Sequence, residues 1–263
     1  MTALGQNSTG TIIADPSTGA SVTLTWAAGT DVGNHRAANE DSYVLACPYF
    51  AVAEGMGGLS AGDFASDCVV TSIASLETSG FAELAALEGA LHDAVTNLKS
   101  KLTEDQQGAG TTVTGLALML EEGQLQWNSF NIGDSRVYVQ MGEMFEQVTT
   151  DHSVVQQLVD AGTITKEEAD YHPHANVITR AVGILDEPVP DYVALPVLAG
   201  MRLLIASDGL TKELTDVGIS HFLSTAPSPA DAVTDLIAAA LGNSGRDNVT
   251  VIVVDVVAVT EGS

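Results

Sequence analysis

Acidic residues recur along the chain where predicted strands meet turns. Glu54, with Gly55, ends the apolar run 51–53, and Asp208 follows the apolar segment 201–207. The remaining positions are Glu40, Asp41, Asp134 and Asp247, in the segments 36–42, 133–136 and 246–248. Each aspartate alone is ordinary, because Asp, Asn, Ser and Gly are common turn residues. If the fold gathers these carboxylates, they suit hard divalent cations such as Mg²⁺ or Mn²⁺.

Glu54 is the most informative of these residues. Glutamate is not a turn former, and Val52 and Ala53 place it at the end of a strand that should be buried. A carboxylate there needs a partner or a cation. Two cations about 3.5–4 Å apart would form a site for in-line hydrolysis of a phosphate ester. Arg36 could bind the phosphate, because its planar donors match phosphate oxygens.

Hydrophobic periodicity predicts the elements that must position these residues. A helical pattern runs from residue 61 to about residue 101, and Gly80 divides it into two helices. Two further short helices are expected at 151–161 and 165–170, and a longer one at 231–241. Strands are expected at 21–27, 42–47, 49–53, 111–120, 123–130, 135–141, 144–148, 201–207 and 249–257.

The order of these elements predicts the fold class. The strands between 111 and 148 follow one another through short turns, which favours an antiparallel meander. Strands and helices are grouped in blocks and do not alternate as βαβ units. The sequence therefore predicts an α+β protein with antiparallel sheets and helices on their outer faces.

Composition narrows the functional classes. The 263 residues contain 9 Lys+Arg and 34 Asp+Glu, a formal net charge of −25, which disfavours binding to nucleic acid or anionic membranes. The charge fits a highly soluble or salt-adapted surface, or carboxylates that converge on cations. No apolar run approaches the roughly 20 residues that span a bilayer. The two cysteines form no C-x-x-C pair, which argues against a disulfide framework or a thiolate zinc site.

The chain ends suggest simple boundaries. Residues 1–20 are polar and lack the pattern of a signal peptide, so we expect a flexible leader and a cytoplasmic protein. Residues 21–258 are predicted to form one domain, and residues 259–263 a short tail.

Seven segments, in this order, resemble the bacterial branch of the metal-dependent Ser/Thr protein phosphatases, the PPM or type 2C family. They are 36–42, 51–66, 110–118, 131–139, 149–165, 203–210 and 245–254. The resemblance implies a four-layer α-β-β-α sandwich of two antiparallel sheets. It also implies Mn²⁺ or Mg²⁺, two ions per site, and hydrolysis of phosphoserine and phosphothreonine by a water that bridges the metals. The implied partners are proteins that a bacterial Ser/Thr kinase has phosphorylated on serine or threonine.

The resemblance also assigns roles. Glu54 stands where the family has a metal-bridging aspartate, and Gly55 would offer a backbone carbonyl to one metal. Asp208 and Asp247 would hold the second metal. Asp41, with Glu40 beside it, would lie in or just behind the metal shell. Asp134 would help Asp208 to hold a third, weaker ion. Arg36 would bind the substrate phosphate, and residues 151–181 would form the mobile flap.

Glu54 leaves three hypotheses open. Its extra methylene adds about 1.5 Å of reach. The enzyme could tolerate this, could work slowly, or could be a pseudophosphatase that acts as a binding module. Because Mg²⁺ demands near-ideal octahedral geometry, we expect dependence on Mn²⁺ and a gain of activity on Glu54→Asp.

One competing motif is weak. Gly58, Ser60 and Gly62 fit the G-x-S-x-G pattern of serine hydrolases. That motif needs the serine directly between a strand and a helix, whereas six residues separate Ala53 from Ser60.

Overall fold

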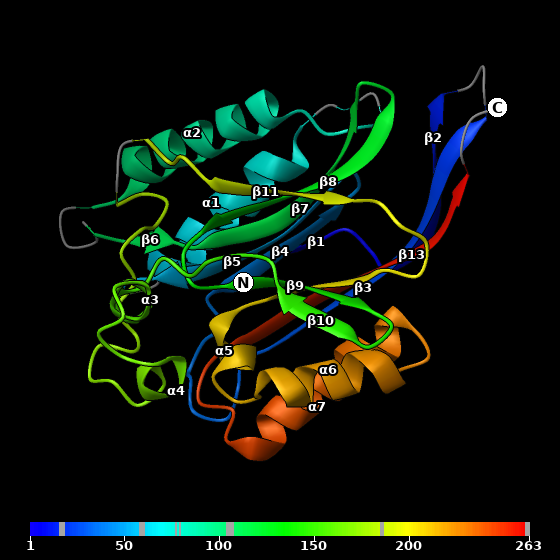
Figure 1. The fold of residues 1–263 in the computed structure, drawn as a ribbon. Helices are drawn as coiled ribbons and strands as arrows, with labels where there is room; N and C mark the ends of the chain where they lie inside the picture. Colours follow the sequence, from blue (N-terminus) through cyan, green and yellow to red (C-terminus); the bar gives the residue numbers. More distant parts are fainter. Residues whose placement is uncertain are drawn as a thin grey trace.

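The structure is a computed structural model that describes residues 1–15, 19–57, 61–76, 78, 80–103, 108–184 and 187–260. The serine of the competing motif, Ser60, lies outside these residues. Two β-sheets pack face to face, and helices cover the outer face of each sheet (Figure 1). The α+β class and the four layers predicted from the sequence are confirmed.

The first sheet contains seven strands of the described chain. In spatial order they are β1 (Ala3–Leu4), β4 (Asp41–Ala46), β5 (Tyr49–Met56), β7 (Val113–Glu121), β8 (Gln124–Ile132) and β11 (Asp191–Pro196), with β6 (Gly110–Thr111) beside β5. All its pairs are antiparallel except β1 with β4, which is parallel. The expectation of two purely antiparallel sheets is therefore corrected. Between β1 and β4 the chain passes through β2 and β3 of the second sheet, so β4 can return beside β1 in the same direction.

Within the described residues, the second sheet contains six strands, and all of its pairs are antiparallel. Their order is β10 (Met144–Gln147), β9 (Arg136–Met141), β12 (Arg202–Ala206), β13 (Val249–Thr260), β3 (Ala20–Asp31) and β2 (Ser8–Asp15). Phe50 and Trp127 from the first sheet pack edge to face between the sheets, with ring centroids 6.2 Å apart. This shared core fixes how the strand ends of the two sheets face each other.

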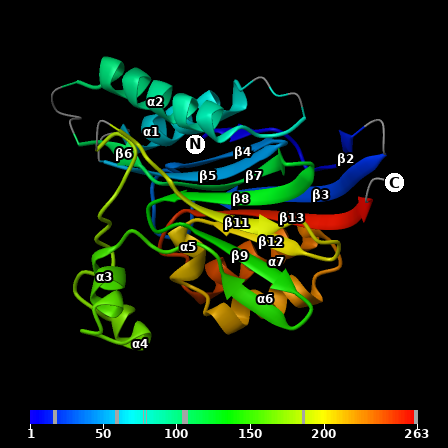
Figure 2. The same cartoon turned by 45° about the horizontal axis from the view of Figure 1, so that its top comes forward.

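Each outer layer buries its own apolar cluster. Helices α1 (Ala61–Ala74) and α2 (Leu84–Lys101) cover the first sheet, and the break between them includes Gly80, as predicted. Helices α6 (Asp216–Thr225) and α7 (Pro229–Asn243) cover the second sheet. The short helices α3 (Val154–Asp160) and α4 (Lys166–Ala169) project beside α5 (Asp208–Thr211) at one end of the sandwich (Figure 2).

The predicted meander is wrong at its centre. Strands β7 and β8 pair, and so do β9 and β10, but β8 and β9 belong to different sheets. The chain crosses between the sheets through Gly133, Asp134 and Ser135. Gly133 has a φ of +124°, and a Cβ there would overlap the Thr112 side chain, so glycine allows the crossing. The crossing places Asp134 where the two sheets meet.

The expected flexible leader also differs from the structure. Residues 3–4 and 8–15 form strands, and β2 pairs with β3 along its length. Thr9 and Thr11 place their hydroxyls 2.9 Å from those of Thr25 and Thr23 across the pair. Because these paired side chains are polar, β2 lacks the alternation of apolar and polar residues that predicts a strand. The sequence therefore did not indicate this strand.

None of the helices within the described ranges is long and apolar enough to cross a membrane.

Candidate metal centre

Glu54 lies at the end of β5, and neighbouring strands fix its backbone. Its N–H donates to Thr112 Oγ1 at 3.1 Å, and its carbonyl accepts from the Thr112 N–H and the Thr111 hydroxyl, both at 2.9 Å. Its register partner on β4 is Asp41. The β4–β5 hairpin therefore sets two acidic residues side by side at one end of the first sheet.

The second sheet brings Asp208 and Asp134 to the same place. Strands β9 and β12 pair antiparallel, with Arg136 opposite Ala206, so Asp134 precedes one strand where Asp208 follows the other. Ligand atoms of Glu54, Asp134 and Asp208 all lie within 4.8 Å of one another. We call these three residues the carboxylate cluster. The fold thus joins acidic residues that are far apart in the sequence.

Close backbone packing holds Asp208 in position. Gly209 lies against the carbonyl of Asn248, and a Cβ at Gly209 would overlap that oxygen. Only glycine permits this approach of α5 to the start of β13. The Asp208-Gly209 pair is therefore a packing requirement as well as a chemical one.

Two buried carboxylate oxygens, one in the cluster and one beside it, lack hydrogen-bond partners among the described residues. Asp41 accepts from the Thr250 hydroxyl at 2.7 Å through Oδ2, but its Oδ1 has no partner. Asp208 Oδ1 is likewise unpartnered. Unsatisfied buried polar atoms are costly and rare in native proteins. Unpartnered oxygens on clustered carboxylates are the donor set that Mn²⁺ or Mg²⁺ takes, so these residues fit such a metal.

Electrostatics supports the same reading. Burial, followed by the charges of Asp208, Asp41 and Asp134, raises the pKa of Glu54. Burial, opposed by hydrogen bonds from Thr250 and Ser207 and assisted by Asp208, raises the pKa of Asp41 to about 7. Burial and the Asp208 charge raise the pKa of Asp134 to about 7. These carboxylates carry their full negative charge at neutral pH only at a cost that a bound cation would remove.

Arg36 and Asp247 form an ion pair at the rim of the site. Arg36 Nη2 donates to Asp247 Oδ2 at 2.6 Å, and 53% of the Arg36 side chain is exposed. The hydrogen bond with Asp247 raises the pKa of Arg36 although burial opposes it. An exposed guanidinium beside the carboxylates is placed to meet an incoming anion.

Glu40 and Gly55 hold the backbone around the site. The Gly55 N–H donates to the Glu40 carbonyl at 3.1 Å, and a Cβ at Gly55 would overlap the carbonyl of Gly62. Burial, and then the charge of Asp63, raises the pKa of Glu40. Glu40, Asp41 and Asp247 do not belong to the group of three carboxylates within 4.8 Å. Their predicted roles as ligands, and that of Gly55, remain predictions.

The sequence analysis missed two residues that shape the site. Lys212 forms an ion pair with Asp208 Oδ2, and its i,i+4 spacing from Asp208 was the available signal. Asn248 is buried and donates through Nδ2 to the carbonyls of Val32 and Ala38, and it accepts from the Glu40 N–H through Oδ1. Asn248 therefore holds the loop that carries Arg36. No sequence pattern distinguishes it from an ordinary turn asparagine.

Residues 151–181, the predicted flap, contain α3 and α4 and are tied to the sheets near both ends. At the start, Arg136 of β9 donates through Nε to both Asp151 oxygens at 3.0 Å and through Nη2 to Asp151 Oδ2 at 2.7 Å. At the other end, Arg180 donates to Asp191 of β11 at 2.6 Å. His152 Nε2 also lies 3.0 Å from Asp191. The Gly133 N–H donates to His152 Nδ1, so the segment also touches the crossing that carries Asp134.

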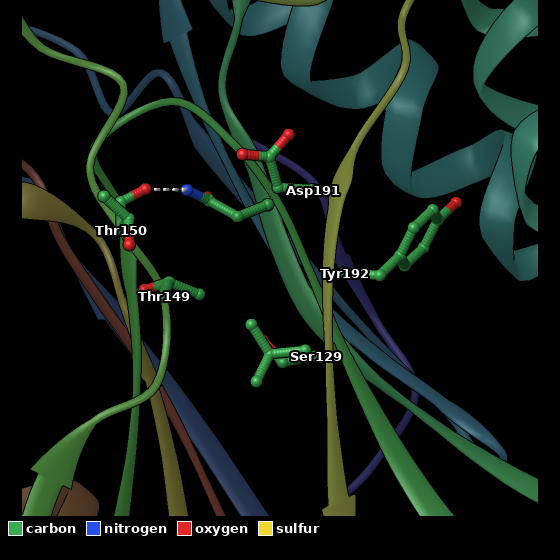
Figure 3. A pocket seen from close by; sticks show the side chains of 7 residues that line it. Ser129, Thr149, Thr150, Asp191 and Tyr192 are labelled. Carbon is green, nitrogen blue, oxygen red and sulfur yellow. Dashed lines mark hydrogen bonds between the residues drawn. The ribbon is translucent and has the colours of Figure 1, made fainter.

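A polar cavity of about 320 Å³ lies beside this segment and apart from the carboxylate cluster. The Asn131 amide donates to the Thr150 carbonyl at 3.1 Å, and Figure 3 draws this bond as the dashed line that ends at Thr150. The lining residues are Ser129, Asn131, Thr149, Thr150, Asp191, Tyr192 and Val193. The cavity is lined by β8 and β11 on one side and by the chain that leads into α3 on the other.

A two-sheet sandwich with a carboxylate cluster at the meeting of its strand ends defines a class of metal-binding proteins, and comparison with known proteins identifies the family. The model of the family described as protein phosphatase 2C matches residues 34–242. The chain belongs to this family.

Two relatives show how far the similarity extends. The chain is 38% identical over 238 residues to the serine/threonine protein phosphatase PstP of Mycobacterium tuberculosis, covering 89% of this chain and 45% of PstP. It therefore spans less than half the length of that relative. It is 35% identical over 236 residues to the protein phosphatase PhpP of Streptococcus pneumoniae, covering 86% of this chain and 94% of PhpP.

The fold also matches that of a solved structure. The crystal structure of the PstP catalytic domain in complex with two manganese ions superposes with a TM-score of 0.78 at 36% identity. The match covers 89% of this chain and 99% of that domain. That relative holds two Mn²⁺ ions on the same fold.

Proposed function

We propose that this protein is a metal-dependent serine/threonine protein phosphatase, a phosphoric monoester hydrolase. The observation that carries the proposal is the convergence of Glu54, Asp134 and Asp208 within 4.8 Å. The unpartnered oxygens of Asp41 and Asp208 support it, because they are positioned to bind a cation. Membership of the protein phosphatase 2C family and the manganese-bound relative point to the same chemistry.

Each residue has a part in this reaction. Glu54, Asp134 and Asp208, together with Asp41, Asp247 and the Gly55 carbonyl, would hold Mn²⁺ or Mg²⁺. When bound, these ions would activate water and neutralise charge on the phosphate. Arg36 would leave Asp247 and bind the phosphate oxygens of the substrate, which holds the phosphorus atom in line for attack.

The substrates follow from the same chemistry. We infer that they are proteins phosphorylated on serine or threonine, so a Ser/Thr kinase must supply them. The excess of acidic residues argues against nucleic acid as a substrate. We further propose that the protein acts in the cytoplasm.

The alternative function is a binding module with weakened or absent catalysis. It rests on Glu54. Glu54 Oε2 lies 3.4 Å from both the Ser135 hydroxyl and the Asp208 N–H, so the longer side chain reaches protein donors as well as the cluster. A carboxylate drawn toward protein donors, even by weak contacts of this length, offers less of its charge to a metal.

Hydrolysis of a phosphothreonine peptide across a series of Mn²⁺ and Mg²⁺ concentrations tests the proposal. We expect metal-dependent turnover, higher with Mn²⁺, that Asp208→Asn lowers about 100-fold or more, since even outer partners of metal ligands are worth 10–100-fold. Asp235→Asn, the same change on the exposed face of α7, should leave turnover intact. Folded protein without turnover in either metal would contradict the enzyme and favour the binding module.

A further inference from the structure

Lys212 brings a positive charge directly into the carboxylate cluster. It follows the short helix α5 (Asp208–Thr211), and its N–H donates to the Asp208 carbonyl at 2.8 Å. This turn directs the Lys212 side chain back along the helix, and its ammonium pairs with Asp208 Oδ2. About two thirds of the side chain is buried. The Lys212 ammonium is therefore a partly buried charge and not one half of a surface ion pair.

The ammonium acts on more than one member of the cluster. Its charge lowers the pKa of Glu54 and of Asp134, against the larger effect of burial, which raises both. In return the charges of Asp208, Glu54 and Asp134 raise the pKa of Lys212 although burial opposes this. The chain has only 9 Lys+Arg among 263 residues, and one of them contacts the carboxylate cluster.

Lys212 contacts an atom that a metal would use. Asp208 Oδ1 has no hydrogen-bond partner among the described residues, whereas Oδ2 is held by Lys212. A cation bound by Asp208 and Asp134 must therefore displace the ammonium from Oδ2 or share the carboxylate with it. In both cases like charges lie close together in a partly buried site, where repulsion is poorly screened.

We propose that Lys212 is an internal counter-ion that competes with metal for Asp208: it offsets part of the negative charge of the cluster when metal is absent and weakens the binding of metal there. The proposal rests on the metal site of the proposed function and adds a residue that sets its affinity. Metal occupancy then depends on exchange of one cation for another, since the ammonium must give up Asp208 before the metal gains it.

Replacement of Lys212 with methionine separates this role from simple packing, because Met keeps the length of the chain and removes the charge. In the full chain stripped with EDTA, we expect Mn²⁺ to bind Lys212→Met about 10- to 100-fold more tightly than wild type in calorimetric titration. The melting temperature in EDTA should fall, and its rise on addition of Mn²⁺ should be larger than in wild type.

Lys166→Met is the matched control. Lys166 pairs with Asp216 on an exposed surface at 3.0 Å, so it loses the same charge outside the cluster. We expect its Mn²⁺ affinity to stay within about twofold of wild type. If the Met variant does not fold without metal, Lys212→Gln takes its place. Its neutral amide can still donate to Asp208, and we expect it also to bind Mn²⁺ more tightly than wild type.

Unchanged or weaker Mn²⁺ binding in the Lys212 variants would overturn the proposal, because it would mean that Lys212 orients Asp208 for the metal or has no influence on it. Neither the titration nor the melting experiment requires turnover. A protein that binds Mn²⁺ as expected but hydrolyses no phosphopeptide would therefore refute the proposed enzyme and leave the role of Lys212 standing.

Discussion

At the scale of single residues, Glu54 stands where the resemblance to the family predicts a metal-bridging aspartate. Its Oε2 lies 3.4 Å from the Ser135 hydroxyl and from the Asp208 N–H, beyond the usual length of a strong hydrogen bond. Its backbone, in contrast, is fixed by Thr111 and Thr112. Because the backbone is fixed, the extra methylene must be accommodated by the conformation of the Glu54 side chain and by the positions of the metals.

Glu54→Asp should raise kcat/KM about tenfold or more with Mg²⁺ and less with Mn²⁺, because Mg²⁺ tolerates misplaced ligands poorly. Steady-state rates on a phosphothreonine peptide, measured with each metal, test this. Glu88→Asp on α2, the same change on the outer helical layer, serves as the control. Lower turnover of Glu54→Asp would mean that the glutamate is an adaptation of this chain.

The acidic residues could be predicted from the sequence because their types and their places at strand ends are visible there. Lys212 and Asn248 could not be predicted in the same way. Lys212 is four residues from Asp208, but i,i+4 pairs are common on solvent-exposed helices, and nothing local shows that this pair is buried. Asn248 acts on backbone groups of residues 32–40, which only the tertiary fold brings to it.

At the scale of elements, local periodicity predicted most strands and helices but not which strands pair. The hairpins β4–β5 and β7–β8 follow from their turns and alternation. The separation of β8 from β9 does not, because the three residues between Ile132 and Arg136 resemble an ordinary turn. Pairing of β9 with β12 depends on a partner about 65 residues away, so this contact is invisible to local patterns.

The segment 151–181 is held to the sheets by two ion pairs of unequal burial, which gives an element-scale prediction. The Arg136–Asp151 side chains are 21% and 9% exposed, whereas those of Arg180 and Asp191 are 30% and 59% exposed. Asp151→Asn leaves a buried guanidinium without its charged partner and should lower the free energy of unfolding by about 3 kcal/mol.

Asp191→Asn is the matched control at the other end of the segment, and an exposed pair of this kind should cost about 1 kcal/mol or less. Urea unfolding of both variants at saturating Mn²⁺ measures the difference. Equal costs would show that burial does not distinguish the two ends and that the segment is not anchored mainly by β9.

At the scale of the whole molecule, the excess of acidic charge has a local and a general component. The acidic side chains that give the formal net charge of −25 repel one another, and salt screens this repulsion at the surface. The buried carboxylates at the metal centre are screened much less. Salt therefore offers a way to separate the two contributions to stability.

The pH dependence of metal-free stability follows from the raised pKa values. Asp41 and Asp134 titrate near pH 7 in the folded protein, since burial and neighbouring carboxylates raise the pKa of each to about 7, against about 3.9 when unfolded. Between these values the native state binds more protons than the unfolded state, so stability falls as pH rises from about 4 to about 7. Above pH 7 this contribution becomes constant.

We therefore expect the melting temperature in EDTA and 0.5 M NaCl to fall between pH 5 and pH 8, and Asp41→Asn to flatten the slope. With Mn²⁺ present the slope should reverse, because metal binds the deprotonated carboxylates and so binds more tightly as pH rises. Melting scans across pH with and without Mn²⁺ measure both slopes. A metal-free protein that gains stability toward pH 8 would show that these carboxylates are already compensated within the chain.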